Sequence, residues 1–284
     1  MKICSLRSRN LPRRRQKLEY NKMLRKIPLL LIFLLLFSLA IFSQQRLIMV
    51  GGGDRTLDVL TKMVELSGGE TGNILVITWA SGVPQESFDA FREDIEKISK
   101  IKLIKAPFTP LDDKTKSQFL EQLNEAKGIF FGGGDQTRIM EVLKDESIHK
   151  ALLEKYNNGT LFSGSSAGTA IMSEKMITGE GDFKVIDAEK VEIKPGLGLL
   201  TDAIVDQHFI VRQRQNRLMG LIWKYPNLLG IGIDEDTALF VKDNRYCEVL
   251  GSSKVMFFDA KKEPMKVMLL KTGDKFDMRK RKKI

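Results

Sequence analysis

The sequence LFSGSSAGTAIMS, residues 161–173, predicts a strand, a tight turn and a helix, because a short apolar run ends there in small residues and a helix start follows. Its centre, Gly164-Ser165-Ser166-Ala167-Gly168, is a Gly-x-Ser-x-Gly motif at the end of an expected strand. A turn this tight raises the central serine, Ser166, to where a substrate can reach it. The backbone N–H of Ala167 then faces the same point and can form half of an oxyanion hole. Plain Gly/Ser turns between a strand and a helix are also common, so the rest of the chain must decide.

Around this stretch, apolar runs alternate with amphipathic stretches from residue 46 onward, a pattern typical of a mostly parallel sheet flanked by helices. The expected strands are 46–50, 73–78, 101–105, 127–131, 160–164 and 202–206. The expected helices are 55–66, 85–99, 113–124, 136–144, 147–156, 167–174 and 210–224. Strand signals dominate beyond residue 228, and no linker or repeat divides the chain. The sequence therefore predicts one α/β domain over 45–274 with a β-rich C-terminal part, followed by a frayed basic tail over 275–284.

The formal net charge of +10 comes from the two ends of the chain. Residues 1–44 carry ten Lys and Arg against one Glu, and residues 279–283 are all basic. The remainder, 45–278, holds 31 of the 46 basic and 35 of the 36 acidic residues. Because the folded part is mildly acidic, we expect no nucleic-acid partner.

An uncharged apolar run, IPLLLIFLLLFSLAIF, spans the 16 residues 27–42 behind Arg25 and Lys26. Its length lies between the roughly 7–15 residues of a signal-peptide core and the about 20 of a membrane span. Because the first strand is expected to begin almost at once, at Arg46, we expect residues 1–44 to be a basic leader with a cleaved signal peptide. The protein would then be periplasmic or extracellular. The alternative is an uncleaved membrane anchor formed by residues 27–42, the only part of the chain expected to meet a membrane.

A glycine run, Gly132-Gly133-Gly134, follows the expected strand 127–131. Ligands of open α/β sheets bind at this edge, and glycines let the backbone approach a substrate closely. A free N–H from Gly133 or Gly134 would complete the oxyanion hole with Ala167. The chain lacks the GxGxxG and GxxxxGK[ST] spacings and has few His and Cys, so we expect no nucleotide cofactor and no metal.

Only two histidines, His149 and His208, are available as a base for the serine. His149 lies in a charged amphipathic stretch and is expected on the surface, whereas His208 follows an apolar strand at the same sheet edge as Ser166. A lone histidine at a strand end is more often structural, but a serine nucleophile needs a base that titrates near neutrality. His208 is therefore the candidate base. Its acidic partner is either Asp206 or Glu235, and spacing alone does not choose between them.

Three arginines, Arg212, Arg214 and Arg217, follow the candidate base. Guanidinium groups bind carboxylates bidentately, so these residues are candidates for clamping an acidic substrate. A solvated helix face is the alternative, but this spacing does not place the three on one helical stripe.

Four segments in this order resemble the cyanophycinases of peptidase family S51: FFGGGDQTRI (130–139), SGSSAGTAIMS (163–173), GLGLL…DQHFIVRQRQNRL (196–217) and GIGIDEDTALFV (230–241). The resemblance implies a class I glutamine amidotransferase-like fold and a serine peptidase in which Ser166 is the nucleophile, His208 the base and Glu235 the acidic member. It also implies that the substrate pocket is formed by Gln136, Asp206, Gln207, Arg212, Arg214 and Arg217. The family's substrate is multi-L-arginyl-poly-L-aspartate, a polyaspartate with arginine on each β-carboxyl, which is cut to β-Asp-Arg dipeptides.

The chain departs from the usual family pattern at Ser165, where threonine is common, and at Gly251-Ser252-Ser253, where Gly-Ser-Gly is common. These departures keep open a second function, an isoaspartyl or Asp-X peptidase on the same scaffold. A third alternative is a non-catalytic binding protein anchored by residues 27–42. The expected partner is a peptide or polymer substrate, and the sequence is compatible with a homodimer.

Overall fold

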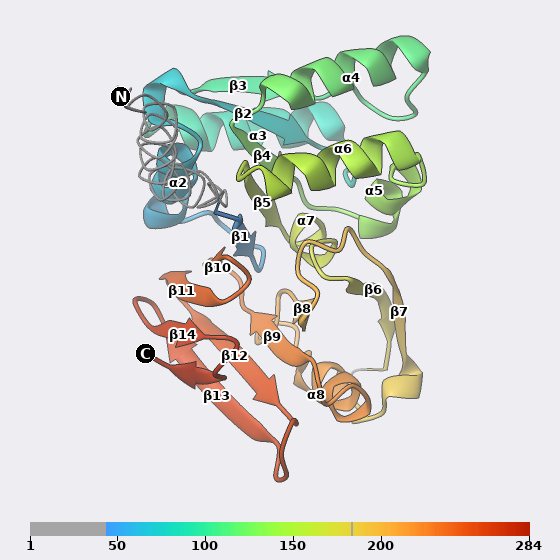
Figure 1. Ribbon diagram of the computed structural model, residues 1–284, viewed down its shortest axis with the longest axis vertical. Coiled ribbons are helices and arrows are strands. Elements are labelled where there is room, and N and C mark those ends of the chain that lie inside the picture. Colours follow the sequence, from blue (N-terminus) through green and yellow to red (C-terminus); the bar gives the residue numbers. More distant parts are fainter. Residues whose placement is uncertain (1–43, 183) are drawn as a thin grey trace, which may run out of the picture. The chain divides into compact units, whose positions relative to one another are not determined.

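The computed structural model describes residues 44–182 and 184–284 (Figure 1). The apolar run 27–42, with both of its interpretations, lies outside the described residues. Among the residues that are described, no helix is both long enough and apolar enough to cross a membrane.

The central sheet of the described chain has nine strands and is parallel on one side and antiparallel on the other. The parallel side consists, in spatial order, of β1 (Arg46–Val50), β5 (Leu161–Ser165), β4 (Gly128–Phe131), β2 (Asn73–Ile77) and β3 (Lys102–Lys105). On the other side of β1 lie four antiparallel strands, β10 (Thr237–Lys242), β11 (Tyr246–Gly251), β14 (Lys275–Asp277) and β15 (Lys282–Lys283). The predicted α/β class with a mostly parallel sheet is confirmed.

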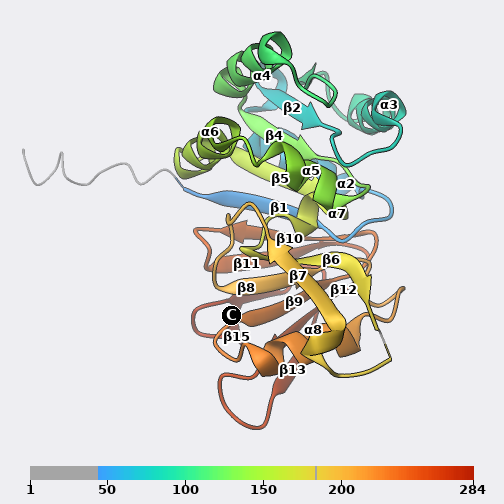
Figure 2. The same ribbon diagram turned by 90° about the vertical axis from the view of Figure 1, so that its right-hand side faces the viewer.

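Helices cover both faces of the parallel part, which is why its strands are nearly continuous apolar runs. In β1, Leu47 and Met49 face one core cluster, whereas Ile48 and Val50 face another. The first cluster is covered by α4 (Asp113–Glu125), α5 (Gln136–Val142) and α6 (Glu146–Asn157). The second is covered by α2 (Leu57–Leu66) and α3 (Pro84–Glu96), and Figure 2 shows α4 and α6 on one side of the sheet and α3 on the other.

A second sheet supplies the β-rich C-terminal part. Its strands, in order, are β13 (Lys266–Lys271), β12 (Lys254–Asp259), β9 (Leu229–Ile233) and β8 (Ala203–Asp206). The helix α8 (Gln215–Lys224) packs on one face through Leu218, Leu221 and Ile222. A two-stranded ribbon of β6 (Lys175–Gly181) and β7 (Val191–Pro195) completes the described strands, and 3₁₀ turns span Gly69–Thr71 and Ala188–Lys190.

Most predicted helices differ from the observed ones by a few residues at their ends, and two are markedly shorter in the structure. The helix expected over 167–174 is α7 (Ala167–Ala170), and the helix expected over 210–224 begins only at Gln215. In the second case residues 209–213 form a turn, because the buried Asp234 carboxylate accepts hydrogen bonds from the backbone N–H groups of Ile210 and Val211.

The expectation of a frayed basic tail is wrong. Phe276 in β14 pairs with Cys247 of β11, is fully buried and stacks on Phe257 with 4.3 Å between ring centroids. Asp277 accepts a 2.9 Å hydrogen bond from the Arg245 guanidinium. The lysines of β15 are exposed, so the tail has a basic surface although the buried side chain of Phe276 attaches it to the sheet.

Replacing Phe276 by alanine should therefore lower the free energy of unfolding by about 3–5 kcal/mol, the usual cost of emptying a buried aromatic site. Urea unfolding followed by circular dichroism measures the change. Lys282→Ala, which alters an exposed residue of the same tail, serves as the control and should change stability little.

Candidate active site

The Gly-x-Ser-x-Gly motif has the strand–turn–helix context predicted for it. Ser166 lies between β5 and α7 with φ 53° and ψ −109°, a strained backbone conformation for a residue with a side chain. Its N–H donates to the Val50 carbonyl of the neighbouring strand at 3.1 Å. A Cβ atom at Gly168 would lie 2.1 Å from the carbonyl oxygen of Phe131, so the last position of the motif admits only glycine.

Three side chains from three strand ends form a continuous hydrogen-bonded chain. The Oγ of Ser166 lies 2.7 Å from Nε2 of His208, and Nδ1 of His208 lies 2.5 Å from Oε1 of Glu235. His208 and Glu235 follow the adjacent parallel strands β8 and β9, which brings them to one sheet edge. Glu235, not Asp206, is therefore the carboxylate that contacts the imidazole.

The glycine loop after β1 holds the imidazole from the other side. The N–H of His208 donates to the Gly51 carbonyl at 2.7 Å. At Gly52, with φ 120°, a Cβ atom would lie 2.1 Å from Cε1 of His208. This role of the glycine run Gly51–Gly53 was not predicted from the sequence. The signal was a glycine run at the same sheet edge as the serine.

The electrostatic surroundings favour a neutral imidazole. Burial lowers the pKa of His208 below its ordinary value of 6.5, and the positive charges of Arg212 and Arg214 lower it further. The hydrogen bond and negative charge of Glu235 oppose this shift without reversing it. At neutral pH the ring is therefore uncharged and able to accept a proton from the serine.

Neutralising Arg212 should move the acid limb of the pH–activity profile to higher pH. A base must be unprotonated, so activity falls as pH drops through the pKa of His208, which lies below 6.5 in the parent. Arg212→Gln removes a positive charge that disfavours the imidazolium, so the pKa rises. The measurement is kcat/KM against pH, with Arg92→Gln, a change at a partly exposed residue on α3, as control. A limb that stays in place or moves to lower pH would contradict the assignment.

The expected oxyanion donors border the serine. A Cβ atom at Gly133 would lie 3.5 Å from Cβ of Ser166, so the loop after β4 lies directly beside the nucleophile position. Within residues 44–182 and 184–284, the N–H groups of Gly133 and Ala167 have no hydrogen-bond acceptor. Gly134 has φ 133° and packs against the Ala80 carbonyl, where a Cβ atom would lie at 2.1 Å. The loop thus presents backbone donors to the space in front of Ser166.

The residues expected in the substrate pocket fall into an inner and an outer group. Asp206 and Arg217 are each 1% exposed and bind each other through two hydrogen bonds, of 2.7 Å and 2.5 Å. Arg214 is buried beside them and donates to the carbonyl and side-chain oxygens of Gln207. Arg212, in contrast, is exposed. The inner residues therefore brace the segment that carries His208, and Arg212 is the arginine of the three that faces solvent.

Gln136 is also engaged within the protein. Its Nε2 donates to the carbonyl oxygen of Ile177 at 3.0 Å, which ties the first residue of α5 to β6. The side chain is 6% exposed. This contact links the glycine loop beside Ser166 to the β6–β7 ribbon.

Asp234 is a structural contributor that the sequence analysis did not assign. It is 4% exposed, and its carboxylate accepts from the N–H groups of Ile210 (2.9 Å) and Val211 (3.0 Å) and from Oγ of Ser253 (2.7 Å). The turn that it holds begins directly after His208. An acidic residue at the end of the apolar run GIGI was the available signal.

We expect Asp234→Ala to lower kcat/KM by about 10–100-fold, because sub-ångström displacement of a base is costly. Ser253→Ala removes one of the three donors and should lose much less. Kinetics and thermal unfolding of both variants are compared. A loss of activity that merely follows the loss of folded protein would show that Asp234 does not position His208.

Two further features of the described chain bear on cofactors and reactivity. Among the described residues, no group of three or more His, Cys, Asp and Glu side chains is arranged to hold a metal ion. Cys247 is a free, buried thiol in β11, and burial raises its pKa well above the ordinary value.

The chain is similar in sequence to known peptidases. The sequence model of peptidase family S51 matches residues 47–249. The cyanophycinase of Trichormus variabilis is 30% identical over 221 residues, covering 76% of this chain and 74% of that protein. The cyanophycinase of Geminocystis herdmanii is 28% identical over 222 residues, covering 77% and 82%.

Solved structures agree with the fold. A peptidase from an acI-B1 Actinobacterium superposes with a TM-score of 0.64 at 20% identity, covering 83% of this chain and 98% of that one. A putative peptidase E from Listeria monocytogenes EGD-e gives a TM-score of 0.54 at 18% identity, covering 74% and 100%. At these identities the likeness concerns the arrangement of helices and strands.

Proposed function

The chain belongs to peptidase family S51, and from that membership we propose that it is a serine peptidase of the cyanophycinase type. Its reaction would be the hydrolysis of multi-L-arginyl-poly-L-aspartate to β-Asp-Arg dipeptides. The observation that carries the proposal is the continuous contact from Ser166 Oγ through His208 to Glu235, at 2.7 Å and 2.5 Å. This is the order of nucleophile, base and orienting carboxylate that acyl transfer requires.

In the proposed mechanism, Ser166 Oγ attacks the scissile carbonyl while Nε2 of His208 takes its proton. Glu235 holds the ring and stabilises the imidazolium that forms. The oxyanion lies against the N–H groups of Ala167 and Gly133, with Gly134 as the alternative second donor. The C–N bond then breaks, His208 returns the proton to the leaving amine, and an ester to Ser166 remains. Water, deprotonated by the same histidine, hydrolyses that ester and frees the serine.

Substrate charge supports the polymer assignment. Each unit of the polymer bears a free carboxylate and a guanidinium on its arginine. Arg212 is exposed and close enough to His208 for its charge to lower the pKa of the ring. An exposed guanidinium beside the reacting centre suits a substrate carboxylate. Two relatives that cover about three quarters of this chain are cyanophycinases.

The test compares the full chain with its Ser166→Ala variant on insoluble cyanophycin and, separately, on short isoaspartyl peptides, with products identified by mass. Release of β-Asp-Arg by the parent alone supports both mechanism and substrate. Cleavage of only the short peptides would keep the mechanism and replace the substrate by isoaspartyl or Asp-X peptides. Cleavage of neither would favour a non-catalytic binding protein.

We further propose that residues 1–44 direct export and that the apolar run 27–42 is a signal-peptide core. Its length and the basic residues before it support this. Fractionation of cells that express the full chain with a C-terminal tag, with N-terminal sequencing of the product, tests it. A cleaved soluble product supports export, whereas an intact membrane-bound product would identify an anchor.

A further inference from the structure

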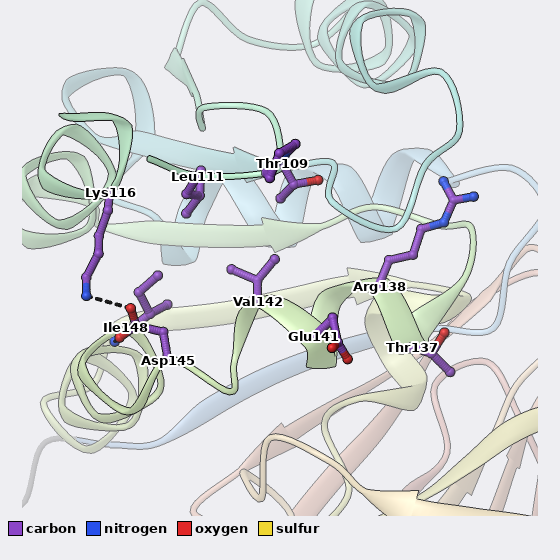
Figure 3. A pocket seen from close by; sticks show the side chains of 10 residues that line it. Thr109, Leu111, Lys116, Thr137, Arg138, Glu141, Val142, Asp145 and Ile148 are labelled. Carbon is purple, nitrogen blue, oxygen red and sulfur yellow. Dashed lines mark hydrogen bonds and ion pairs between the residues drawn. The ribbon is translucent and has the colours of Figure 1, made fainter. Parts of the chain in front are cut away.

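A pocket of about 560 Å³ lies on the α4–α5–α6 side of the sheet, separate from the Ser166–His208–Glu235 contacts. The loop of Thr109, Pro110 and Leu111 borders it on one side, and α5 and α6 border it on the other (Figure 3). Its volume falls within the range of about 300–1,000 Å³ that is typical of small-molecule or peptide sites. Nothing in the proposed chemistry at Ser166 uses this pocket.

One end of the pocket is close to the glycine loop beside the nucleophile. Helix α5 begins at Gln136, directly after that loop, and Thr137 and Arg138 in its first turn line the pocket. Arg138 is five residues from Gly133, whose backbone borders Ser166. An extended chain covers roughly 3.3–3.6 Å per residue, so a few units of a polymer held at Ser166 can reach the first turn of α5.

The charges along the pocket are not equally available. At the far end, Lys116 and Asp145 form an ion pair at 2.5 Å and neutralise each other (Figure 3). At the near end, Arg138 is exposed, and its guanidinium makes a long, 3.4 Å contact with the Ser81 carbonyl. That contact uses one of the guanidinium nitrogens and leaves other N–H groups able to donate to a carboxylate. Arg138 is therefore the cation of this pocket that can bind an acidic group.

A carboxylate is displayed one helical turn further along. Glu141 lies three residues after Arg138 on α5, is exposed, and pairs with Lys144, which is also exposed, at 2.5 Å. Such a solvent-exposed pair is weak and exchanges partners easily. Residues three apart on a helix have Cβ atoms about 5–6 Å apart, so Arg138 and Glu141 leave α5 at neighbouring positions, and Figure 3 shows their charged ends pointing in different directions. Leu111, Val142 and Ile148 add an apolar surface for the aliphatic parts of a side chain.

We propose that this pocket is a secondary binding site for polymer units outside the scissile one. Arg138 binds the free carboxylate of an arginine branch, and Glu141 binds the guanidinium of the same or the next branch. The inference rests on the proposed function, since it identifies what holds a long substrate while one bond lies at Ser166. A ligand that carries only carboxylates would contact Arg138 alone, and a ligand that carries only guanidinium groups would contact Glu141 alone.

The test uses charge reversal in the full chain, Arg138→Glu, with Arg92→Glu as the matched control. Arg92 is a partly exposed arginine on α3, which packs on the opposite face of the sheet, and it forms ion pairs with Asp89 and Glu96. We expect Arg138→Glu to raise KM for long cyanophycin by about 5-fold and to leave kcat/KM for a two-unit fragment nearly unchanged. The control should alter neither value. Equal losses on both substrates, or no loss on either, would overturn the proposal.

A binding measurement separates this inference from the proposed function. Ser166→Ala, alone and combined with Arg138→Glu or Arg92→Glu, is sedimented with insoluble cyanophycin at increasing polymer concentration. Weaker retention of only the Arg138→Glu combination supports the site even if the parent cleaves no polymer, in which case the proposed activity alone fails. Retention that does not depend on Arg138 overturns the site whatever the activity.

Discussion

Replacing Ser166 by alanine is expected to lower kcat/KM by roughly 10³–10⁶-fold, the range found for other serine triads. The change removes the atom that attacks the carbonyl, and no other hydroxyl lies within hydrogen-bond distance of His208 Nε2 among the described residues. The fold should persist, because the turn is held by the Ser166 N–H and by Gly168, both of which remain. Initial rates and thermal unfolding of the purified variant provide the measurement.

Ser165→Ala is the matched control for this experiment. Ser165 precedes the nucleophile position, lies in β5 and is 5% exposed, so its hydroxyl is not presented to substrate. We expect it to retain most of the activity. Inactivation by Ser165→Ala together with activity of Ser166→Ala would shift the register of the motif by one residue and contradict the assignment.

His208→Ala is expected to reduce activity nearly as much as Ser166→Ala, and the double variant should be little worse than either single one. The serine and the histidine act in the same step, so removing either one already abolishes that step and the two losses in rate do not add. His149→Ala is the control, because His149 lies in α6 and its Nε2 contacts the Leu197 carbonyl rather than the triad. Full activity of His208→Ala, or simple addition of the two losses, would contradict the arrangement.

The sequence was most informative where local chemistry sets the backbone. The small residues of 164–168 predicted a strand–turn–helix, and the alternation of apolar runs predicted the parallel sheet, which the structure confirms. The strand before His208 was expected to end at the same sheet edge as Ser166, but β8 and β9 belong to the second sheet, so His208 and Glu235 reach Ser166 from a different sheet. Ser166 and His208 could still be suggested in advance, because the motif marks the serine and the chain has only two histidines, and the family resemblance supplied Glu235.

Features that depend on tertiary partners were not predictable in the same way. Asp206 and Glu235 were equivalent by spacing, and before the structure only the family resemblance favoured Glu235; in the structure Arg217 binds Asp206 while His208 contacts Glu235. The strand β14 was not predicted, because Phe276 is a single aromatic residue among charged ones and a single apolar position gives no periodic signal. The donors that Asp234 satisfies lie more than 18 residues away in sequence, on two different segments.

Labelling with a serine-directed fluorophosphonate, read by intact-protein and peptide mass spectrometry, tests whether Ser166 is a nucleophile activated by His208. The reagent forms a covalent bond only with a hydroxyl that a neighbouring base activates. We expect one adduct on the parent, located at Ser166, and none on Ser166→Ala or His208→Ala. Absence of labelling on the folded parent, or an adduct that persists when either residue is replaced, would contradict a nucleophilic Ser166 activated by His208.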